Sequence, residues 1–427
     1  MRMETKLSAI TRRAKEDPNC KFTSLAHLLT EDFLKECYEE LKVTTPGVDG
    51  VTIKDYGKNL DDNISDLVSR MKAKRYIPKP VKRIYIPKGN GKRPIGIPAT
   101  EDKVVQLAIK KILEAIFEQD FLDTSHGFRP NRSCHDAIDD LDKTIMYKPV
   151  NYILDMDIES FFDNIDRKIL MDCLRKRITD FSLLCIIGRI LKSGIMEQGE
   201  YFSTEQGTPQ GSILSPILAN IFLHYALDRW FQQLETKGFA KLIRYADDFV
   251  MCFQESTDAR RTSWALIRRL KEFGLEISKK KSKRIKFGRL PWKEATASNK
   301  RCETFDFLGF TFFCDKTRKG YFKVGRKTSR KRLTEKLRDI KYWMKRMRTV
   351  DIKIWWPILK SKLLGHYRYY GVSGNFAEIL KFYRQVVKLA FKWINRRSQK
   401  KSYNWEQFQK FLQYNPLPRP KIYHSYR

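Results

Sequence analysis

Several features common in membrane and secreted proteins are missing from this sequence. No apolar run approaches the roughly 20 residues that a membrane-spanning helix needs. Residues 1–15 are polar and charged, unlike a secretory signal. The eight cysteines are scattered, with no C-x-x-C pair and no histidine at zinc-ligand spacing. We therefore expect a cytoplasmic protein of the bacterial intracellular type, whose cysteines are reduced and mostly fill hydrophobic cores.

Acidic residues are scarce in the last third of the chain. Residues 1–278 contain 43 Lys and Arg against 41 Asp and Glu, whereas residues 279–427 contain 41 against 9. Nearly all of the formal net charge of +34 therefore lies in the carboxyl-terminal part. Such a density of positive charge repels itself unless a polyanion neutralises it, so the composition predicts nucleic acid or an anionic membrane as the partner.

The hydrophobic pattern predicts an α+β protein of two or three packed units. Helical spacing of apolar residues is found at 24–42, 60–74, 101–117, 166–178, 180–193, 213–234, 328–348, 357–370, 376–397 and 404–413. Stretches typical of strands and hairpins are found at 81–97, 152–158, 240–253 and 305–313. The strands are confined to residues before 320, and the most basic helices follow them.

Two groups of acidic residues stand inside apolar stretches. Asp247 and Asp248 are adjacent in a predicted hairpin turn, and Asp155 and Asp157 lie within a predicted strand. Unpaired carboxylates in such positions are unfavourable, and divalent cations are natural partners for them. Phosphoryl transfer uses two magnesium ions about 4 Å apart that are held by such oxygen ligands. Asp157 on the strand and Asp247 in the turn are therefore candidates to bridge two ions.

These motifs resemble those of reverse transcriptases. Tyr245-Ala246-Asp247-Asp248 is similar to the Y-A-D-D box of that family, and Asp157 with Phe161-Phe162-Asp163 is similar to its first palm motif. The resemblance implies a right-hand polymerase with fingers, palm and an α-helical thumb. It also implies templated DNA synthesis with two Mg²⁺ ions bound by Asp157, Asp247 and Asp248.

Asp155 remains the competing metal ligand on the first strand. We prefer Asp157 because Phe162 then stands five residues later, where the family places the side chain that excludes a 2′-hydroxyl. The alternative for the Phe161-Phe162 pair is that both rings belong to the core.

Further stretches resemble motifs of group II intron reverse transcriptases in the same order along the chain. Residues 86–98 match the fingers motif, which implies that Lys88 and Arg93 contact the triphosphate, and residues 127–133 match the next motif. Residues 206–216 match the palm loop, with Gln210 and Gly211 against the nascent base pair. Lys281 fits the lysine near the departing pyrophosphate, although four lysines crowd that segment.

Each of these stretches has a structural alternative. Residues 86–98 would also fit a solvated basic turn, and residues 127–133 a helix-capping loop. Residues 206–216 would also fit a glycine-rich loop that caps the following helix. Phe307-Leu308-Gly309-Phe310 resembles the hairpin that grips the primer end, and a plain buried β-turn is its competitor.

The basic region resembles the thumb and maturase domain of group II intron proteins. The stretches that carry this resemblance are residues 365–371, 374–375 and 396–400. It implies that Tyr367, Arg368, Arg396 and Arg397 bind structured intron RNA. Tyr369 and Trp393 are further candidates for stacking on bases, while several of these aromatic residues must instead form the helical core.

The predicted organisation is a helical extension at 1–74, fingers and palm at 75–320, and a basic thumb and maturase domain at 321–427. The predicted partners are an RNA template, a DNA or RNA primer, dNTPs and structured intron RNA, with no membrane and the oligomeric state left open. No cysteine pair with a His-Asn-His endonuclease follows the thumb, so the chain resembles class C members without that domain.

Two alternative functions are kept. One is a retron-like or diversity-generating reverse transcriptase, and the other is a non-catalytic RNA-binding splicing cofactor. The three acids argue against the cofactor, and residues 47–50 together with the maturase-like thumb favour the intron type.

Overall fold

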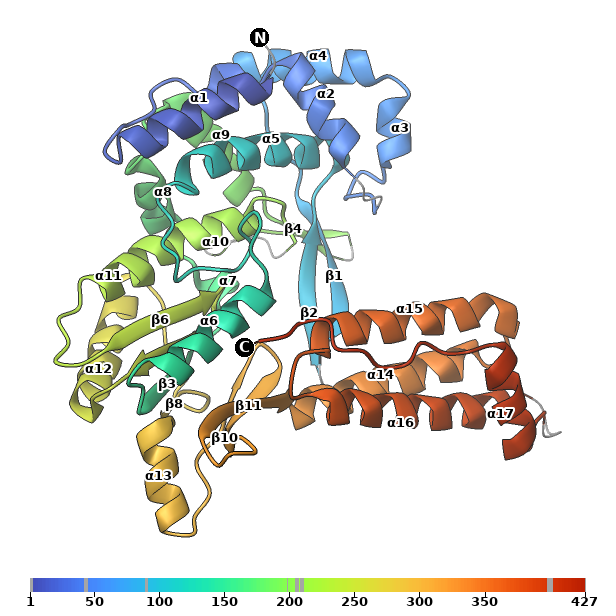
Figure 1. The fold of residues 1–427 in the computed structure, drawn as a ribbon. Helices are drawn as coiled ribbons and strands as arrows, with labels where there is room; N and C mark the ends of the chain where they lie inside the picture. Colours follow the sequence, from blue (N-terminus) through green and yellow to red (C-terminus); the bar gives the residue numbers. More distant parts are fainter. Residues whose placement is uncertain are drawn as a thin grey trace.

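The computed structural model describes residues 3–41, 45–88, 91–197, 199–203, 207, 211–397 and 402–426, with the backbone alone described at residues 87 and 88. Helices predominate, and Figure 1 shows one group in an upper amino-terminal layer, others around the strands in the middle of the molecule, and a separate bundle at the carboxyl-terminal side. The α-helices are α1 (Met3–Glu16), α2 (Glu31–Glu40), α3 (Ile53–Gly57), α4 (Leu60–Lys72), α5 (Thr100–Phe117), α6 (Cys134–Tyr147), α7 (Phe161–Asn164), α8 (Arg167–Arg175), α9 (Phe181–Leu191), α10 (Ser215–Leu223), α11 (Arg229–Gln232), α12 (Ser256–Glu272), α13 (Arg289–Ala297), α14 (Arg330–Met347), α15 (Ile352–Tyr370), α16 (Phe376–Ile394) and α17 (Trp405–Tyr414).

The described strands form three sheets, ordered β2-β1-β4-β5, β6-β7-β3-β8 and β11-β10-β9. Their bounds are β1 (Val81–Lys88), β2 (Gly91–Ile97), β3 (Tyr152–Asp157), β4 (Ile195–Glu197), β5 (Glu200–Phe202), β6 (Ala240–Tyr245), β7 (Asp248–Phe253), β8 (Lys283–Lys286), β9 (Phe305–Phe307), β10 (Phe310–Lys316) and β11 (Phe322–Thr328). The chain is therefore mixed α+β, as the sequence predicts.

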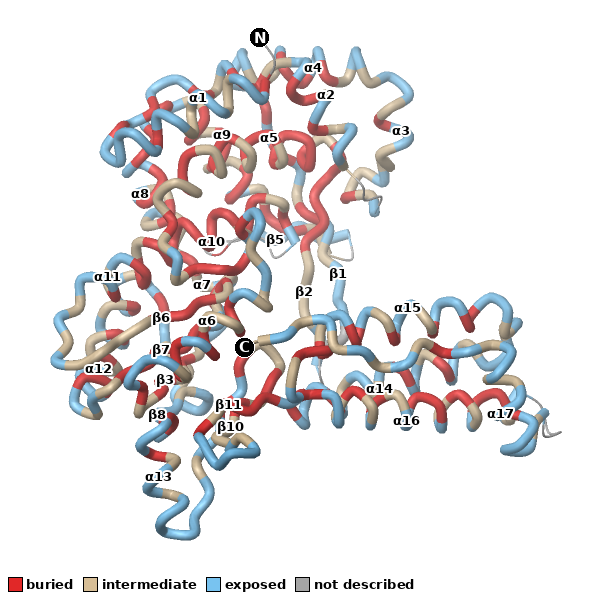
Figure 2. The backbone as a smooth tube through the Cα atoms, viewed as in Figure 1, coloured by how far each residue is buried: buried red, intermediate tan, exposed pale blue. Residues whose placement is uncertain are grey.

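The sheet β6-β7-β3-β8 separates two hydrophobic cores. Because side chains alternate along a strand, Leu154 and Met251 face one side while Ile153 and Val250 face the other. The first core extends under the amino-terminal helices, and the second runs through α6 and β9–β11 into the helices α14–α17. Figure 2 shows the buried backbone on both sides of this sheet.

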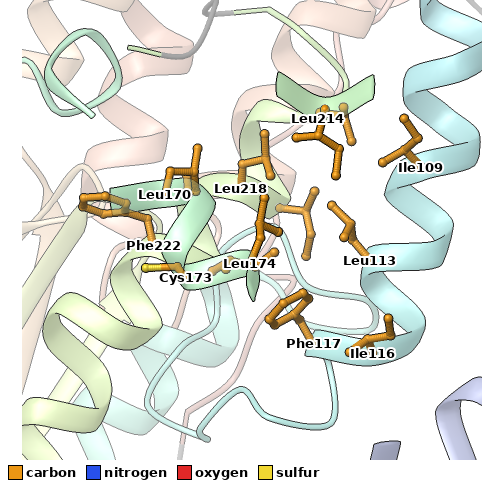
Figure 3. Close-up of a cluster of buried hydrophobic side chains, with 14 of the residues drawn as sticks. Ile109, Leu113, Ile116, Phe117, Leu170, Cys173, Leu174, Leu214, Leu218 and Phe222 are labelled. Carbon is orange, nitrogen blue, oxygen red and sulfur yellow. The ribbon is translucent and has the colours of Figure 1, made fainter. Parts of the chain in front are cut away.

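Helix α5 lies at the centre of the first core. It is buried on almost every face, which explains why its sequence is apolar beyond a single stripe. The close-up in Figure 3 shows its side chains facing those of α8 and α10, with Ile109, Leu113, Ile116 and Phe117 opposite Leu170, Cys173, Leu174, Leu214, Leu218 and Phe222.

Several elements differ from the sequence-based expectation. The segment 24–42 is a 3₁₀ turn at Ala26–Leu28 followed by α2, because Thr30 caps the second helix. The helix expected at 213–234 is α10 and α11 joined by a π-helical turn at His224–Asp228. Helices α1, α6 and α12 and strands β8 and β11 were not anticipated. The proposed domain boundary at 320 falls in the turn between β10 and β11, and its position stays a prediction.

The structure also describes the state of the cysteines and the apolar character of the helices. All eight cysteines are free thiols. Within the described ranges, no helix has both the length and the apolar character required to cross a membrane.

Candidate active site

Three of the predicted acids meet at one end of the central sheet. In the antiparallel pairing of β3 with β7, Asp157 stands directly opposite Asp248. Strand β6 pairs with β7 so that Tyr245 is opposite Asp248, which leaves Ala246 and Asp247 as a two-residue hairpin loop. The sheet register therefore brings together acids that are 90 residues apart in the sequence.

The hairpin loop has an unusual backbone. Ala246 adopts a left-handed conformation with φ of 57° although it is not glycine. Directly against it lies Gly127, where a Cβ atom would be only 2.3 Å from the backbone nitrogen of Ala246. Only glycine fits at position 127. The loop that contains the motif at residues 127–133 is therefore packed against the acidic turn.

The carboxylates crowd one another. Asp155, on the same face of β3 as Asp157, is largely buried, and its pKa is raised to about 7 by burial and then by the charge of Asp248. Asp248 is open to solvent on one side, yet burial of its carboxyl by the surrounding protein, followed by the charges of Asp247 and Asp157, raises its pKa to about 6. Such crowding of like charges is typical of a site that binds cations.

A lysine contributes positive charge at this cluster. The Lys281 Nζ lies 2.7 Å from Asp157 Oδ2. The preceding turn is tied to the same strand, because the Ser278 backbone N–H donates to the Asp157 carbonyl at 2.8 Å. Of the four clustered lysines, Lys281 is thus the one whose ammonium is bonded to a candidate ligand.

The donor set fits magnesium in its chemistry. Hard carboxylate oxygens on two adjacent strands are the ligands that Mg²⁺ prefers. Among the described residues, however, no three carboxylate, imidazole or thiol side chains converge closely enough to hold an ion as they stand. Asp157 bonds Lys281 instead, so its carboxylate would have to turn from that ammonium to bind a metal.

The two adjacent phenylalanines have different environments. Phe161 is buried in the first core, whereas Phe162 packs against it edge to face at 5.2 Å and keeps part of its ring exposed. Ser160, just before α7, has a left-handed backbone with φ of 44°. The core alternative therefore describes Phe161, and the ring of Phe162 remains accessible.

The palm loop is described only at its glycines and at its end. Gln210 lies outside the described residues, as do 204–206 and 208–209. A Cβ at Gly207 would be 2.7 Å from the Asp163 carbonyl oxygen, and one at Gly211 would be 2.6 Å from the Gly96 carbonyl oxygen. Both glycines have positive φ. The loop thus approaches the backbone of α7 at one point and of β2 at the other.

The fingers hairpin is only partly described. Arg93 is half-buried in β2 and pairs with Ile86 of β1. The side chain of Lys88 and the turn residues 89–90 lie outside the described residues.

A cavity of about 680 Å³ adjoins the acids on the side of the bundle. Asp248 and the turn residues Leu308 and Gly309 form one wall. The Tyr369 hydroxyl donates to the Leu308 carbonyl at 2.9 Å, so the turn is fixed to α15. The remaining polar lining from the helices is Arg332, Lys336, Asp339, Lys362 and His366.

Two aromatic residues proposed for RNA stacking are core residues. Tyr367 is completely buried and Trp393 is 5% exposed, so neither ring can stack on a base. The prediction that Tyr367 binds RNA is wrong, because its side chain is enclosed in the second hydrophobic core. Arg368, Arg396 and Arg397 are exposed, whereas residues 398–400 lie outside the described residues.

Sequence reasoning missed a buried arginine beside the acidic turn. The Arg244 guanidinium is fully enclosed and lies 2.5 Å from the Asp228 carboxylate. A cation within the apolar strand before the turn is the signal that could have identified it.

With this geometry established, comparison with known proteins gives a clear result. The family model described as "Reverse transcriptase (RNA-dependent DNA polymerase)" matches residues 79–312, which is more than half of the chain. This chain belongs to the reverse transcriptase family. Its right-hand polymerase fold is that of the family, and the matched reverse transcriptase segment contains all the candidate acids and Lys281.

The curated relatives of this reverse transcriptase include proteins encoded by group II introns. It is 39% identical over 240 residues to the group II intron-encoded protein LtrA of Lactococcus lactis subsp. cremoris, a match covering 54% of this chain and 39% of that protein. Protein YkfC of Escherichia coli K12 is 32% identical over 279 residues, covering 56% and 72%. An uncharacterized 91 kDa protein in the cob intron of Schizosaccharomyces pombe is 34% identical over 246 residues, covering 54% and 29%.

The match covers about two fifths of the length of LtrA and a smaller share of the S. pombe protein. The resemblance to group II intron reverse transcriptases and maturases is confirmed at the level of the family.

Proposed function

We propose that this chain is an RNA-directed DNA polymerase that extends a DNA or RNA primer on an RNA template. The observation that carries the proposal is the pairing of Asp157 with Asp248 at the mouth of the β6–β7 hairpin, beside Asp247 and Lys281. Membership of the reverse transcriptase family supports it. The substrates are dNTPs, and the site of action is inside the cell.

Asp157, Asp247 and Asp248 would hold two Mg²⁺ ions. When bound, such ions activate the primer 3′-hydroxyl and neutralise the leaving pyrophosphate. When the metal ions bind, the Lys281 ammonium would leave the Asp157 carboxylate and donate a hydrogen bond to a phosphate oxygen instead. Asp155, two residues before Asp157 on the same face of β3, remains the alternative metal ligand. Its greater burial makes direct binding of a metal ion less favourable than for Asp157.

The nucleotide would be positioned by groups around this centre. Phe162, whose ring is partly exposed, is proposed to exclude a ribose 2′-hydroxyl by collision. Arg93 and Lys88 of the fingers hairpin are proposed to bind the triphosphate. Gln210 and Gly211 are proposed to lie against the nascent base pair.

The experiment is primer extension on an RNA template with Mg²⁺ and dNTPs. Asp247→Ala should abolish extension while RNA affinity stays within about twofold, because the affinity comes from cations elsewhere. Asp172→Ala is the matched control, since Asp172 is exposed on α8 and forms an ion pair with neighbouring Arg175. Equal extension by wild type and Asp247→Ala would refute the assignment of the metal site.

We further propose that the chain binds structured intron RNA and assists splicing as a maturase. The exposed Arg368, Arg396 and Arg397 support this, as does a groove on α16 and α17 that contains Lys381, Arg384, Lys388 and Trp405. The test is splicing of an intron RNA by Asp247→Ala, which should remain active. No preference of the wild type for intron RNA over random RNA would refute the maturase role and leave the polymerase role intact.

A further inference from the structure

A network of hydrogen bonds surrounds the buried Arg244. Its Nε and Nη2 bind the two oxygens of Asp228 at 2.7 and 2.5 Å. Its Nη1 donates to Asn220 Oδ1 at 3.0 Å and to the Ala246 carbonyl at 2.9 Å, and Nη2 also donates to Ser125 Oγ at 2.7 Å. A guanidinium has five N–H donors, and here five bonds use all of them.

The surroundings leave no room for solvent. The side chains of Arg244 and Asp228 are both 0% exposed, and Asn220 and Ser125 are equally enclosed. A buried ion pair is weak evidence for stability, because a well-packed apolar pair of the same volume often stabilises a fold as much or more. Stability alone therefore does not explain this pair, and the groups that the guanidinium holds in place matter more.

What it holds is the acidic turn. Ala246 has the left-handed backbone conformation, and its carbonyl accepts directly from Arg244. The Ala246 carbonyl belongs to the same peptide plane as the backbone nitrogen of Asp247. Holding that oxygen inward therefore fixes the orientation from which the Asp247 side chain projects.

The network also connects the turn to three other segments. Asn220 on α10 donates from Nδ2 to the Gly127 carbonyl at 2.7 Å, and Gly127 packs against Ala246. Segment 124–126 pairs with β6 through the Arg244 backbone, whose N–H donates to Thr124 and whose carbonyl accepts from His126. Asp228 is the last residue of the π-helical turn, a local widening often found at functional sites.

We propose that Arg244 is a positioning residue that sets the orientation of the Ala246–Asp247 peptide and so places the Asp247 carboxylate for metal binding. This inference rests on the proposed polymerase function. Asp228, Asn220 and Ser125 fix the guanidinium, and Gly127 closes the turn from the other side. Arg244, Asp228, Asn220 and Ser125 are not among the proposed metal ligands or substrate contacts, and their effect is transmitted through the backbone of the turn.

The test uses the full chain with Arg244→Lys, which keeps the charge but provides three donors from a single atom. Mn²⁺ binding is measured by the electron paramagnetic resonance signal of the free ion, with dNTP and a primer–template lacking the 3′-hydroxyl. The Mn²⁺ dissociation constant should rise about 10- to 100-fold, as is usual when a group orienting a metal ligand is lost. The affinity for primer–template should stay within about twofold, and high Mg²⁺ should restore much of the extension rate.

Arg177→Lys is the matched control. Arg177 is another buried arginine, paired with Asp120 at 3.2 Å, and its side chain donates to the backbone carbonyls of Ala14 and Asp17, which lie outside the turn. It should lose stability without a change in Mn²⁺ affinity. Equal shifts in the two variants, or no shift in Arg244→Lys, would overturn the proposal.

Asn220→Ala provides a second, milder variant that removes one acceptor of the network and the bond to Gly127. It should raise the Mn²⁺ dissociation constant in the same direction by a smaller factor, and an unchanged value would overturn the proposal. A wild type that cannot extend any primer would instead refute the proposed function. A wild type that extends while both variants bind Mn²⁺ normally would refute this inference alone.

Discussion

At the scale of single residues, neighbours in the sequence have different roles. Phe161 is buried in the core, whereas Phe162 packs against that core with part of its ring exposed, although the two are chemically identical. Likewise Asp157 is opposite Asp248 at the mouth of the site, while Asp155 is one step further inside the sheet. The two differ in burial, so their chemistry differs even though both are aspartates in one strand.

We predict that Phe162→Ala admits ribonucleotides. Removing the ring takes away the volume that would collide with a 2′-hydroxyl, so discrimination between dNTP and rNTP should fall at least about tenfold. The measurement is the ratio of kcat/KM for dNTP and rNTP incorporation. Phe161→Leu is the control, because it should lower the free energy of unfolding by about 1 kcal/mol or more without changing that ratio. Undiminished discrimination by Phe162→Ala would place the selecting residue elsewhere.

At the scale of elements, loops without regular structure bring the site together. The palm loop approaches β2 at Gly211 and α7 at Gly207, and the segment 124–126 pairs with β6. The β9–β10 turn at Leu308 and Gly309, with positive φ at both residues as a tight β-hairpin requires, is bonded to α15 through Tyr369. Each contact uses backbone atoms, which explains why glycine occupies several of these positions.

We predict that Gly211→Ala impairs nucleotide binding by disturbing the contact between the palm loop and the fingers. Its Cβ would be 2.6 Å from the Gly96 carbonyl oxygen, and its φ of 108° disfavours any side chain. The strain is of order 1–3 kcal/mol. The KM for dNTP should therefore rise while RNA affinity is unchanged, as measured by steady-state extension and by fluorescence anisotropy.

The matched control for this substitution is Gly188→Ala. Gly188 lies within α9 with nothing within 4 Å of the added Cβ, so the change should raise the free energy of unfolding by up to about 1 kcal/mol. A dNTP KM for Gly211→Ala that matches the value for Gly188→Ala would contradict the predicted contact.

At the scale of the whole molecule, most of the net positive charge lies in the carboxyl-terminal part, which borders the acidic turn through Arg332, Lys336 and Lys362. The acids lie at the end of the central sheet, whereas the helices α14–α17 of the most basic region project to one side in Figure 1. After α17 the chain returns toward α6. There the imidazole of His424 stacks on that of His135, which joins the carboxyl-terminal segment to α6. The bundle is thus attached to α6 both through β11, where Arg326 lies 2.9 Å from Asp142, and through the end of the described chain.

We predict that RNA binding depends steeply on salt and that the exposed arginines at the end of α16 contribute to this dependence. Each phosphate contact releases condensed counterions, so the double variant Arg396→Ala/Arg397→Ala should bind more weakly and lower the slope of log K against log salt by about 1–2. The measurement is affinity for a folded intron RNA across a salt series.

Arg260→Ala/Arg268→Ala provides a control with the same change in charge, on the exposed face of α12 in the nearly neutral part of the chain. It should leave the slope near the wild-type value. Full affinity and slope in the Arg396/Arg397 variant would show that these two side chains make no phosphate contact.

The sequence by itself determined the family to which this protein belongs. The spacing of Asp157, Asp247 and Asp248 among apolar residues, the glycine-rich motifs and the concentration of positive charge identified a family and its candidate residues, because each depends on local pattern. Most helices and hairpins followed from periodicity for the same reason.

Only the tertiary structure decided which residues face which. Helical periodicity alone could not tell that Tyr367 and Trp393 point inward, since large apolar residues also lie on the exposed faces of those helices, Ile354 and Ile358 on α15 and Phe376 on α16. Nor could it place Arg244 beneath the acidic turn, because its partners Ser125, Asn220 and Asp228 come from three separate segments. Long-range packing sets burial and donor–acceptor pairing, and local sequence does not contain that information.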